Sequence, residues 1–192
     1  MNKTDVVLEF LKIKDVYTFQ HSLRVSNISQ EIALKLDLSN RKIELITKAG
    51  LLHDIGKIYL PNDILNKTGK LKKYEMNLIK KHSELGAKLL ENLKYNDEII
   101  KIVLYHHEKL NGTGYPDGLI SDEICLESKI VGIADVIDAM LSNRIYSEGK
   151  KINEVISELS KNKGILYDEE IVEICINNLK KDEVIEKIKI SI

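Results

Sequence analysis

The sequence has few cysteines, few prolines and no long apolar runs. Its two cysteines, Cys125 and Cys175, stand far apart without the close spacing of a zinc knuckle, so we expect both to be small apolar fillers. The apolar runs last only a few residues and the N-terminus is charged, which argues against a membrane span and a signal peptide. The cytoplasm is therefore the expected compartment.

A net positive charge is also missing. Lys and Arg together number 29 and Asp and Glu 30, which leaves a formal net charge of -1 at pH 7. Such a chain has no overall positive field to attract a nucleic-acid polymer or an anionic membrane, so neither is an expected partner. At 43% hydrophobic and 31% charged residues it suits a globular protein, and its length predicts a single domain over residues 1–192.

Helical periodicity dominates what is present. Apolar residues recur at helical spacing and alternating strand patterns are nearly absent, which predicts an all-α fold. In one stretch this spacing predicts a single helix with an apolar stripe made of Leu78, Leu85, Leu89 and Leu93. The expected helices cover residues 4–13, 18–36, 41–54, 73–93, 96–108, 122–143, 152–162, 168–179 and 181–190.

Helix ends and loops also leave signals. Asn40 and Asp168 are expected N-caps, because a short side-chain acceptor can satisfy the free amides of a first helical turn. Residues 109–121 hold three glycines and Pro116 between two expected helices, which predicts a structured loop.

Side chains that bind metals recur along the chain. His53 and Asp54 are adjacent at the end of an apolar helix. A carboxylate can bridge two cations whereas a neutral histidine offers one nitrogen, so Asp54 is the natural bridge between two metals. Taken alone the pair is a weak signal, and a surface histidine beside an acid is the alternative interpretation. Asp135 stands in an otherwise apolar helix, where a buried carboxylate needs a cation or a partner, and Asp138 can share its face.

The other histidines fit two interpretations. His106 and His107 close a helix directly before the glycine-rich loop, where they could bind a second metal or cap the helix C-terminus. His21 lies on an apolar helix face, where a lone histidine is more often a satisfied core residue than a ligand. His82 follows Lys80 and Lys81, and its neighbourhood is also compatible with a metal ligand.

The candidate residues belong to short motifs that follow one another along the chain. They are His21 to Val25, Leu52-His53-Asp54-Ile55-Gly56-Lys57, Leu60 to Leu65, Lys81-His82 with Gly86, His106-His107-Glu108, Gly114-Tyr115-Pro116, and Ile133 to Ala139 with Arg144. In this order the set resembles the HD-GYP branch of the HD superfamily of metal-dependent phosphohydrolases. The resemblance implies an all-α HD-domain helical bundle with additional C-terminal helices.

The resemblance also implies a site with two divalent metal ions that Asp54 bridges. The implied metal ligands are His21, His53, Asp54, His82, His106, His107 and Asp135. Iron or manganese is expected, with zinc, nickel and cobalt as alternatives, because all of them accept mixed histidine and carboxylate ligands. Asp54 and Lys57 are the expected catalytic residues. The expected substrate-binding residues are Lys57, Gly114, Tyr115, Pro116, Asp138 and Arg144.

The implied activity is hydrolysis of a cyclic dinucleotide. Cyclic di-GMP is the expected substrate, with pGpG, GMP or both as products, after attack by a hydroxide that bridges the metals. Two alternatives stay open: a phosphohydrolase for another nucleotide or phosphate ester, and a catalytically silent module that binds a nucleotide. Besides the substrate, the expected partners are a second copy of the chain, in a homo-oligomer, or a separate regulatory protein.

Three residues depart from the pattern of the family. Tyr17 stands where some members carry a glutamate that supports a third metal, so two metals are expected. Asn111 replaces an aspartate, and Ser147 replaces a basic residue that would contact phosphate, which bears on affinity or substrate identity.

Arg144 adds a geometric condition. It follows Asp135 by nine positions, about half a turn out of phase on an ideal helix. Both side chains can face one pocket only if the helix ends around residues 142–143.

Overall fold

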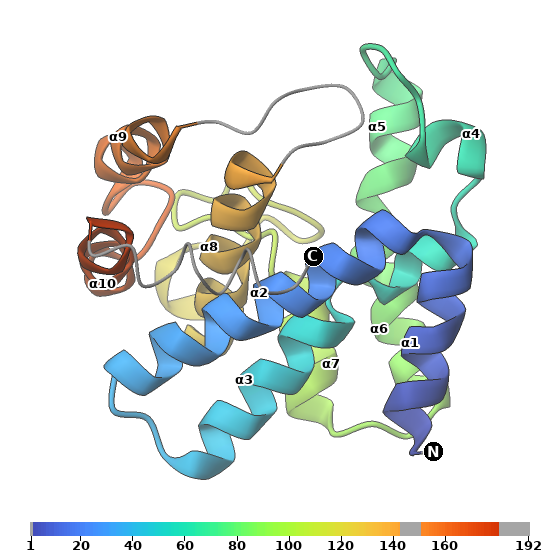
Figure 1. Ribbon diagram of the computed structural model, residues 1–192, viewed down its shortest axis with the longest axis horizontal. Helices are drawn as coiled ribbons and strands as arrows, with labels where there is room; N and C mark the ends of the chain where they lie inside the picture. The colour runs from blue at the N-terminus through green and yellow to red at the C-terminus, as the bar shows by residue number, and fades with distance from the viewer. Residues whose placement is uncertain (1, 143–150, 181–192) are drawn as a thin grey trace.

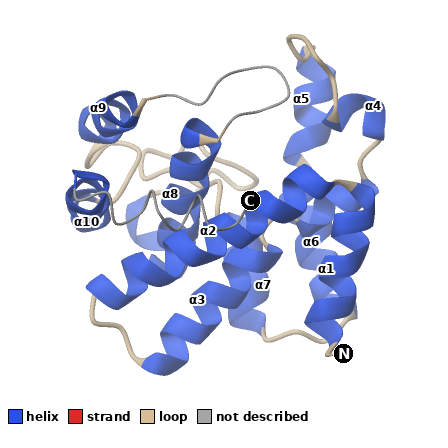
Figure 2. Cartoon of the chain, viewed as in Figure 1, coloured by secondary structure: helices blue, strands red, loops and turns tan. Residues whose placement is uncertain are grey.

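The structure is a computed structural model that describes residues 2–142 and 151–180 (Figure 1). These residues form helices and loops without a β-strand, so the all-α prediction is confirmed (Figure 2). The α-helices are α1 Lys3–Lys14, α2 Val16–Lys35, α3 Asn40–Leu52, α4 Asn62–Leu65, α5 Lys73–Lys80, α6 His82–Asn92, α7 Asp97–Tyr105, α8 Leu126–Leu141, α9 Ile152–Asn162 and α10 Glu169–Lys180. Two 3₁₀ helices, η1 Ile55–Tyr59 and η2 Ser121–Glu123, complete them.

Helix α2 crosses the middle of the bundle and organises the others. It packs against α1, α3, α8 and α10, and Figure 1 shows it running between the edge that holds α1 and the edge that holds α9 and α10. The buried apolar side chains form one cluster that reaches from Val7 in α1 to Leu179 in α10. The helices after residue 151 therefore share the core of the N-terminal helices, as additional C-terminal helices would.

The stretch 73–93 is not the single helix that its periodicity predicts. It divides at Lys81 into α5 and α6, and Leu78 and Leu93 are 36% and 37% exposed instead of lying on a buried stripe. The break lets the backbone of η1 approach the start of α6, where a Cβ on Gly56 would lie 1.9 Å from the carbonyl oxygen of His82. Tertiary contact thus decides where this helix begins.

Other boundaries differ from the prediction by a few residues. Helix α3 ends at Leu52 and α7 at Tyr105, so the histidines after them follow the helices instead of lying inside them. Asp168 caps α10 as predicted, because its Oδ1 accepts from the amides of Glu170 at 3.2 Å and Ile171 at 3.4 Å.

The second expected cap, Asn40, is wrong by one position. The N-cap of α3 is Ser39, whose side chain makes no capping bond. The cysteines are both free, with Cys175 in the core and Cys125 half-buried at the start of α8, where its Sγ lies 3.1 Å from Ser128 Oγ. Cys175 is thus the expected apolar filler, whereas Cys125 also makes a polar contact.

The end of α8 meets the condition set for Arg144. The helix ends at Leu141, with Ser142 in an extended conformation, so the chain can turn before Arg144. Arg144 and Ser147 themselves, and the helix expected over 181–190, lie outside the described residues. No helix in the described part of the chain combines the length and apolar character that a bilayer crossing requires.

Candidate dinuclear metal centre

The seven expected metal ligands come from five parts of the chain and meet in one place. His21 lies in α2, His53 and Asp54 follow α3, and His82 begins α6. The remaining ligands are His106 and His107, which follow α7, and Asp135, which lies in α8. Two glycines permit this convergence, because neither position has room for a Cβ atom. A Cβ on Gly56 would overlap the carbonyl oxygen of His82, and a Cβ on Gly132 would lie 2.3 Å from the carbonyl oxygen of His106.

Three of the histidines are oriented in the same way. In His53, His82 and His106 the Nδ1–H donates to the carbonyl oxygen three residues earlier, at 2.7 Å in each case. These carbonyl groups belong to Gly50, Ile79 and Val103. Because Nδ1 carries the proton, Nε2 keeps its lone pair and is free to bind a metal.

The first group of ligand atoms surrounds one oxygen of Asp54. Asp54 Oδ2 lies 3.5 Å from His21 Nε2 and 3.4 Å from His53 Nε2. Asp135 joins this group, with its Oδ1 3.0 Å from His21 Nε2. His21, His53 and Asp54 can therefore hold one cation together with Asp135.

The second group surrounds the other oxygen of Asp54. Asp54 Oδ1 lies 3.3 Å from His82 Nε2. The Nε2 atoms of His106 and His107 lie 3.4 Å and 3.2 Å from that of His82, so these three histidines can hold a second cation. Asp54 thus turns one oxygen toward each group, which is the arrangement of a bridging carboxylate.

The buried nitrogen atoms in this centre fit a metal better than they fit one another. His53 Nε2 is buried and makes no hydrogen bond within the described part of the chain, and such an orphaned polar atom is costly. Burial lowers the pKa of His82, and lowers the pKa of His106 and His107 well below the ordinary value, so these rings are neutral near pH 7. Neutral imidazoles whose lone pairs converge are the donor set that a divalent cation requires.

The two carboxylates of the centre stay ionised. Burial alone would raise the pKa of Asp54, but Lys57, His53 and His82 outweigh it and hold that pKa well below the ordinary value. Burial alone would also raise the pKa of Asp135, but the hydrogen bond to His21 and the positive charge of that ring and its neighbours together hold it well below the ordinary value. Both side chains therefore present negative charge to a cation.

His21 is held from its other side by Asp138. Asp138 Oδ2 lies 2.7 Å from His21 Nδ1, and Arg24 donates to both oxygens of Asp138 at 2.7 Å and 3.1 Å. Burial alone would lower the pKa of His21, but its hydrogen bonds to Asp135 and Asp138 raise that pKa to about 9. A metal ion at Nε2 would displace the proton that otherwise occupies this position.

The expected role of Asp138 in substrate binding is corrected by this geometry. Its side chain is 0% exposed, and both of its oxygens are used by His21, Arg24 and Ser142. Arg24 was not expected to take part in the site. Its position three residues after His21, on the same helical face, is the signal in the sequence that could have found it.

A cavity of about 420 Å³ opens beside the ligands, and its size is typical of ligand pockets. It is lined by His21, Asp54, His82, His107 and Asp135, together with Tyr17, Lys57 and Tyr115. Lys57 Nζ lies 2.5 Å from Asp54 Oδ2. The Tyr17 ring is parallel to that of His21, with 6.5 Å between the ring centroids.

Tyr115 is positioned by a loop that Glu108 organises. The Tyr115 ring stacks on His107 with 4.6 Å between ring centroids. Burial raises the pKa of its phenol, which therefore stays neutral and can donate a hydrogen bond. The buried Glu108 carboxylate accepts from the backbone amides of residues 117–119, so it holds the loop in shape. The sequence analysis did not predict this role of Glu108. The signal that could have indicated it is the position of this glutamate, directly after His106 and His107 and directly before the glycine-rich loop.

The other loop residues shape the cavity indirectly. Gly114 allows close packing, because a Cβ there would lie 2.4 Å from Glu108 Cα. Neither Gly114 nor Pro116 lines the cavity. Asn111 Oδ1 accepts from the amide and hydroxyl of Thr113, so the Asn111 side chain stabilises the turn away from the cavity.

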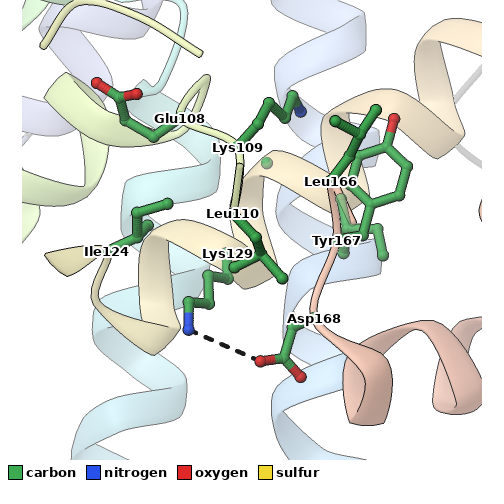
Figure 3. A pocket seen from close by; sticks show the side chains of 10 residues that line it. Glu108, Lys109, Leu110, Ile124, Lys129, Leu166, Tyr167 and Asp168 are labelled. Atoms are coloured by element: carbon green, nitrogen blue, oxygen red, sulfur yellow. Dashed lines mark ion pairs between the residues drawn. The ribbon is translucent and has the colours of Figure 1, made fainter. Parts of the chain in front are cut away.

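A second, much smaller cavity lies beneath this loop (Figure 3). Its volume of about 10 Å³ has room for roughly one water molecule. Lys129 Nζ lies 3.7 Å from Asp168 Oδ2 at its edge, which connects α8 to the residue before α10. This cavity is a packing feature and is too small for a substrate.

Comparison with known proteins places the chain in a family. The HD domain family matches residues 5–171. The chain is 40% identical over 152 residues to the cyclic di-GMP phosphodiesterase response regulator RpfG of Xanthomonas campestris pv. campestris (strain 8004), covering 78% of this chain and 40% of that protein. It is 36% identical over 179 residues to the 3'3'-cGAMP-specific phosphodiesterase 3 of Vibrio cholerae serotype O1, covering 92% of this chain and 38% of the relative. The chain thus spans less than half the length of these relatives.

A solved structure agrees with both the fold and the family. Bd1817, a HDG"Y"P protein from Bdellovibrio bacteriovorus, superposes with a TM-score of 0.70 at 27% sequence identity. The alignment covers 83% of this chain and 51% of that protein. The resemblance noted in the sequence motifs is confirmed, and the chain belongs to the HD domain family, in its HD-GYP branch.

Proposed function

We propose that this chain is a dinuclear metal-dependent phosphodiesterase that hydrolyses a cyclic dinucleotide, with cyclic di-GMP as the first candidate and pGpG, GMP or both as products. The observation that carries the proposal is the orientation of Asp54, whose two oxygens lie 3.4 Å and 3.3 Å from His53 and His82 in separate ligand groups. The similarity to a cyclic di-GMP phosphodiesterase supports the substrate class.

The bound metals would supply the main chemistry of the reaction. Divalent cations held by these residues would make water acidic enough to attack near neutral pH and would withdraw charge from the anionic phosphodiester. His21, His53 and Asp135 would hold one cation and His82, His106 and His107 the other, with Asp54 between them. We propose iron or manganese, with zinc, nickel and cobalt as alternatives for this mixed donor set.

Protein groups outside the ligand set would bind and orient the substrate. Lys57 lines the cavity beside Asp54, so its ammonium can approach a phosphate oxygen once cations neutralise that carboxylate. Tyr115 presents a neutral phenol to the same cavity and can donate to the phosphate or contact a base. Asp138 holds His21 and is itself held by Arg24, so we assign both a positioning role. Arg144 remains a proposed substrate contact.

The expectation of two metals, rather than three, is part of this proposal. Tyr17 lies beside His21 at the cavity, and a neutral phenol is a poor ligand for a further cation. Metal analysis of the purified protein should therefore approach two ions per chain.

A cyclic dinucleotide that contains both guanine and adenine is the second candidate substrate. The specific observation in its favour is the 36% identity to a 3'3'-cGAMP-specific phosphodiesterase. The metal centre would act on the phosphodiester in the same way in both cases. The difference between the two candidates therefore lies in the contacts with the bases.

The experiment that tests the function is anaerobic purification with metal analysis, followed by chromatographic assay of both cyclic dinucleotides. The proposed enzyme converts at least one of them to a linear product with iron or manganese bound. Protein with two metals and no turnover of either compound would contradict the proposal. Faster hydrolysis of a phosphate monoester than of either cyclic dinucleotide would indicate that the substrate is another phosphate ester.

We also propose how the protein is organised and where it acts. The continuous core from Val7 to Leu179 supports treating residues 1–192 as one domain. The cytoplasm is the proposed compartment, because the sequence has no long apolar run. A second copy of the chain or a separate protein would supply regulation.

A further inference from the structure

The cavity beside the metal ligands has a second, apolar lining. The side chains that form it, here called the apolar wall, are Ile64, Leu65, Leu71, Met76 and Ile79. They come from α4, the segment after it, and α5, which lie beside each other at one edge of the molecule (Figure 1). None of them belongs to the hydrophobic core or to the partly buried side chains that pack on it. The core therefore does not explain why these positions are apolar.

The apolar wall is fixed relative to the metal ligands. The carbonyl oxygen of Ile79 accepts the Nδ1–H of His82 at 2.7 Å, which joins the end of α5 to a ligand. Lys67 Nζ lies 2.7 Å and 2.6 Å from the two oxygens of Glu75, a buried carboxylate that also accepts from the Lys72 amide. The segment before α5 is thereby bound to α5 itself. Lys67 also lines the cavity, but its charge is already paired.

The character of the wall indicates what it binds. Met76 is 42% exposed although it lines a cavity that is otherwise rich in charged groups. An apolar side chain left in contact with water gains free energy when a flat apolar group covers it, and a thioether packs well on aromatic rings. A phosphodiester held at the metal ligands would bring such rings into the cavity, because each phosphate of a dinucleotide carries a nucleoside.

We propose that the apolar wall binds the face of a purine base of the nucleotide whose phosphate lies at the metal ligands, with Met76 and Ile64 as the main contacts. This inference rests on the proposed function and extends it to the recognition of the base. The wall contacts the base mainly through apolar packing, which is not directional. It should therefore raise the affinity for a nucleotide over a sugar phosphate without a base, and should distinguish little between guanine and adenine.

Calorimetric titration of the manganese-loaded protein tests the wall without any turnover. GMP and ribose 5-phosphate are the two probes, because they share a sugar phosphate and differ by the base. GMP should bind about 10-fold more tightly than ribose 5-phosphate, because one face of the base covers apolar side chains that otherwise contact water. In Met76→Ala and Ile64→Ala this ratio should fall to about 2-fold, with the affinity for ribose 5-phosphate unchanged. Leu78→Ala is the matched control, since Leu78 lies on α5, is also exposed and does not line the cavity.

Three results would overturn the inference. Equal affinities of the unmodified protein for GMP and ribose 5-phosphate would show that contacts with the base contribute nothing to binding. If the ratio of the two affinities is unchanged in both Met76→Ala and Ile64→Ala, the base binds outside the apolar wall. A change in sedimentation of Met76→Ala with an unchanged ratio would assign the wall to contact with a second copy of the chain.

The same measurements separate this inference from the proposed function. A preference for GMP that depends on Met76, in a protein that hydrolyses no cyclic dinucleotide, would reject the proposed function and retain the wall. Cyclic dinucleotide turnover with equal binding of both probes would reject the wall alone.

Discussion

Asp138 Oδ2 lies 2.7 Å from Nδ1 of His21, and Arg24 fixes Asp138 in turn. This carboxylate holds the ring so that Nε2 faces Asp54 and Asp135. A ligand histidine supported by a buried carboxylate is well oriented and strongly basic toward a cation.

Replacement of Asp138 should therefore weaken metal binding without removing a ligand. Asp138→Asn is expected to lower the affinity for one of the two cations by about 10–100-fold, as loss of such a supporting carboxylate does. Titration with manganese, followed by metal analysis after gel filtration, measures the change. Activity should recover at high metal concentration, and a variant that keeps both cations at low metal concentration would contradict the positioning role.

Asp54 should be more sensitive than any single histidine. Its oxygens face both ligand groups, so Asp54→Ala is expected to release both cations and to abolish hydrolysis. His107→Ala is the comparison, since His107 lies in only one ligand group and should cost one cation. Metal content near two in Asp54→Ala would be incompatible with a bridging carboxylate.

Tyr115 should affect the substrate and leave the metals in place. Tyr115→Phe removes only the phenol, and we expect kcat/KM for the cyclic dinucleotide to fall by about 10-fold, the loss of one hydrogen bond to a charged group. Metal analysis provides the control, because the Tyr115 ring stacks on His107 and is preserved in this variant. A loss of metal equal to that in Asp54→Ala would refute the assignment.

Gly132 should be intolerant of even one added carbon. A Cβ there would lie 2.3 Å from the carbonyl oxygen of His106, so Gly132→Ala must displace α8 or the residues after α7. The expected loss in the free energy of unfolding is about 2 kcal/mol, which lowers Tm by roughly 4–8 °C. Gly69→Ala is the matched control, since a Cβ at Gly69 meets no atom within 4 Å. Equal melting temperatures of the two variants would disprove the close packing.

Acid should destabilise the protein after removal of metal with a chelator. Burial lowers the pKa of His106 and His107, so the folded state keeps both rings neutral while the unfolded chain protonates them below about pH 6.5. Stability therefore falls as the pH drops below 6.5, by about 1.4 kcal/mol per pH unit for each such histidine.

His21 contributes in the opposite direction. Its pKa is raised to about 9, so its contribution is complete below pH 6.5 and disappears as the pH rises through 9. Thermal unfolding between pH 5 and 7 isolates the first effect, and His106→Gln should reduce the slope. An identical slope in that variant would show that His106 is not buried in the neutral form.

The fold class and the metal-binding character of the site could both be predicted from the pattern of residue types along the chain. Helical spacing of apolar residues is a local property, so most helices could be predicted to within a few residues. The candidate histidines and acids could be named because the motifs resemble those of the HD-GYP family in kind and order, and their role as metal ligands stays a proposal.

How these residues face one another depends on the packing of distant segments. The break at Lys81 depends on the contact of Gly56 with His82, and Leu78 is exposed although its spacing matched a buried stripe. Asp138 and Asp135 lie on neighbouring faces of one helix, yet Asp138 turns to the far side of His21 and Asp135 to the cavity. Spacing along a chain fixes which residues share a helical face, whereas the partner opposite that face is set by how distant segments pack.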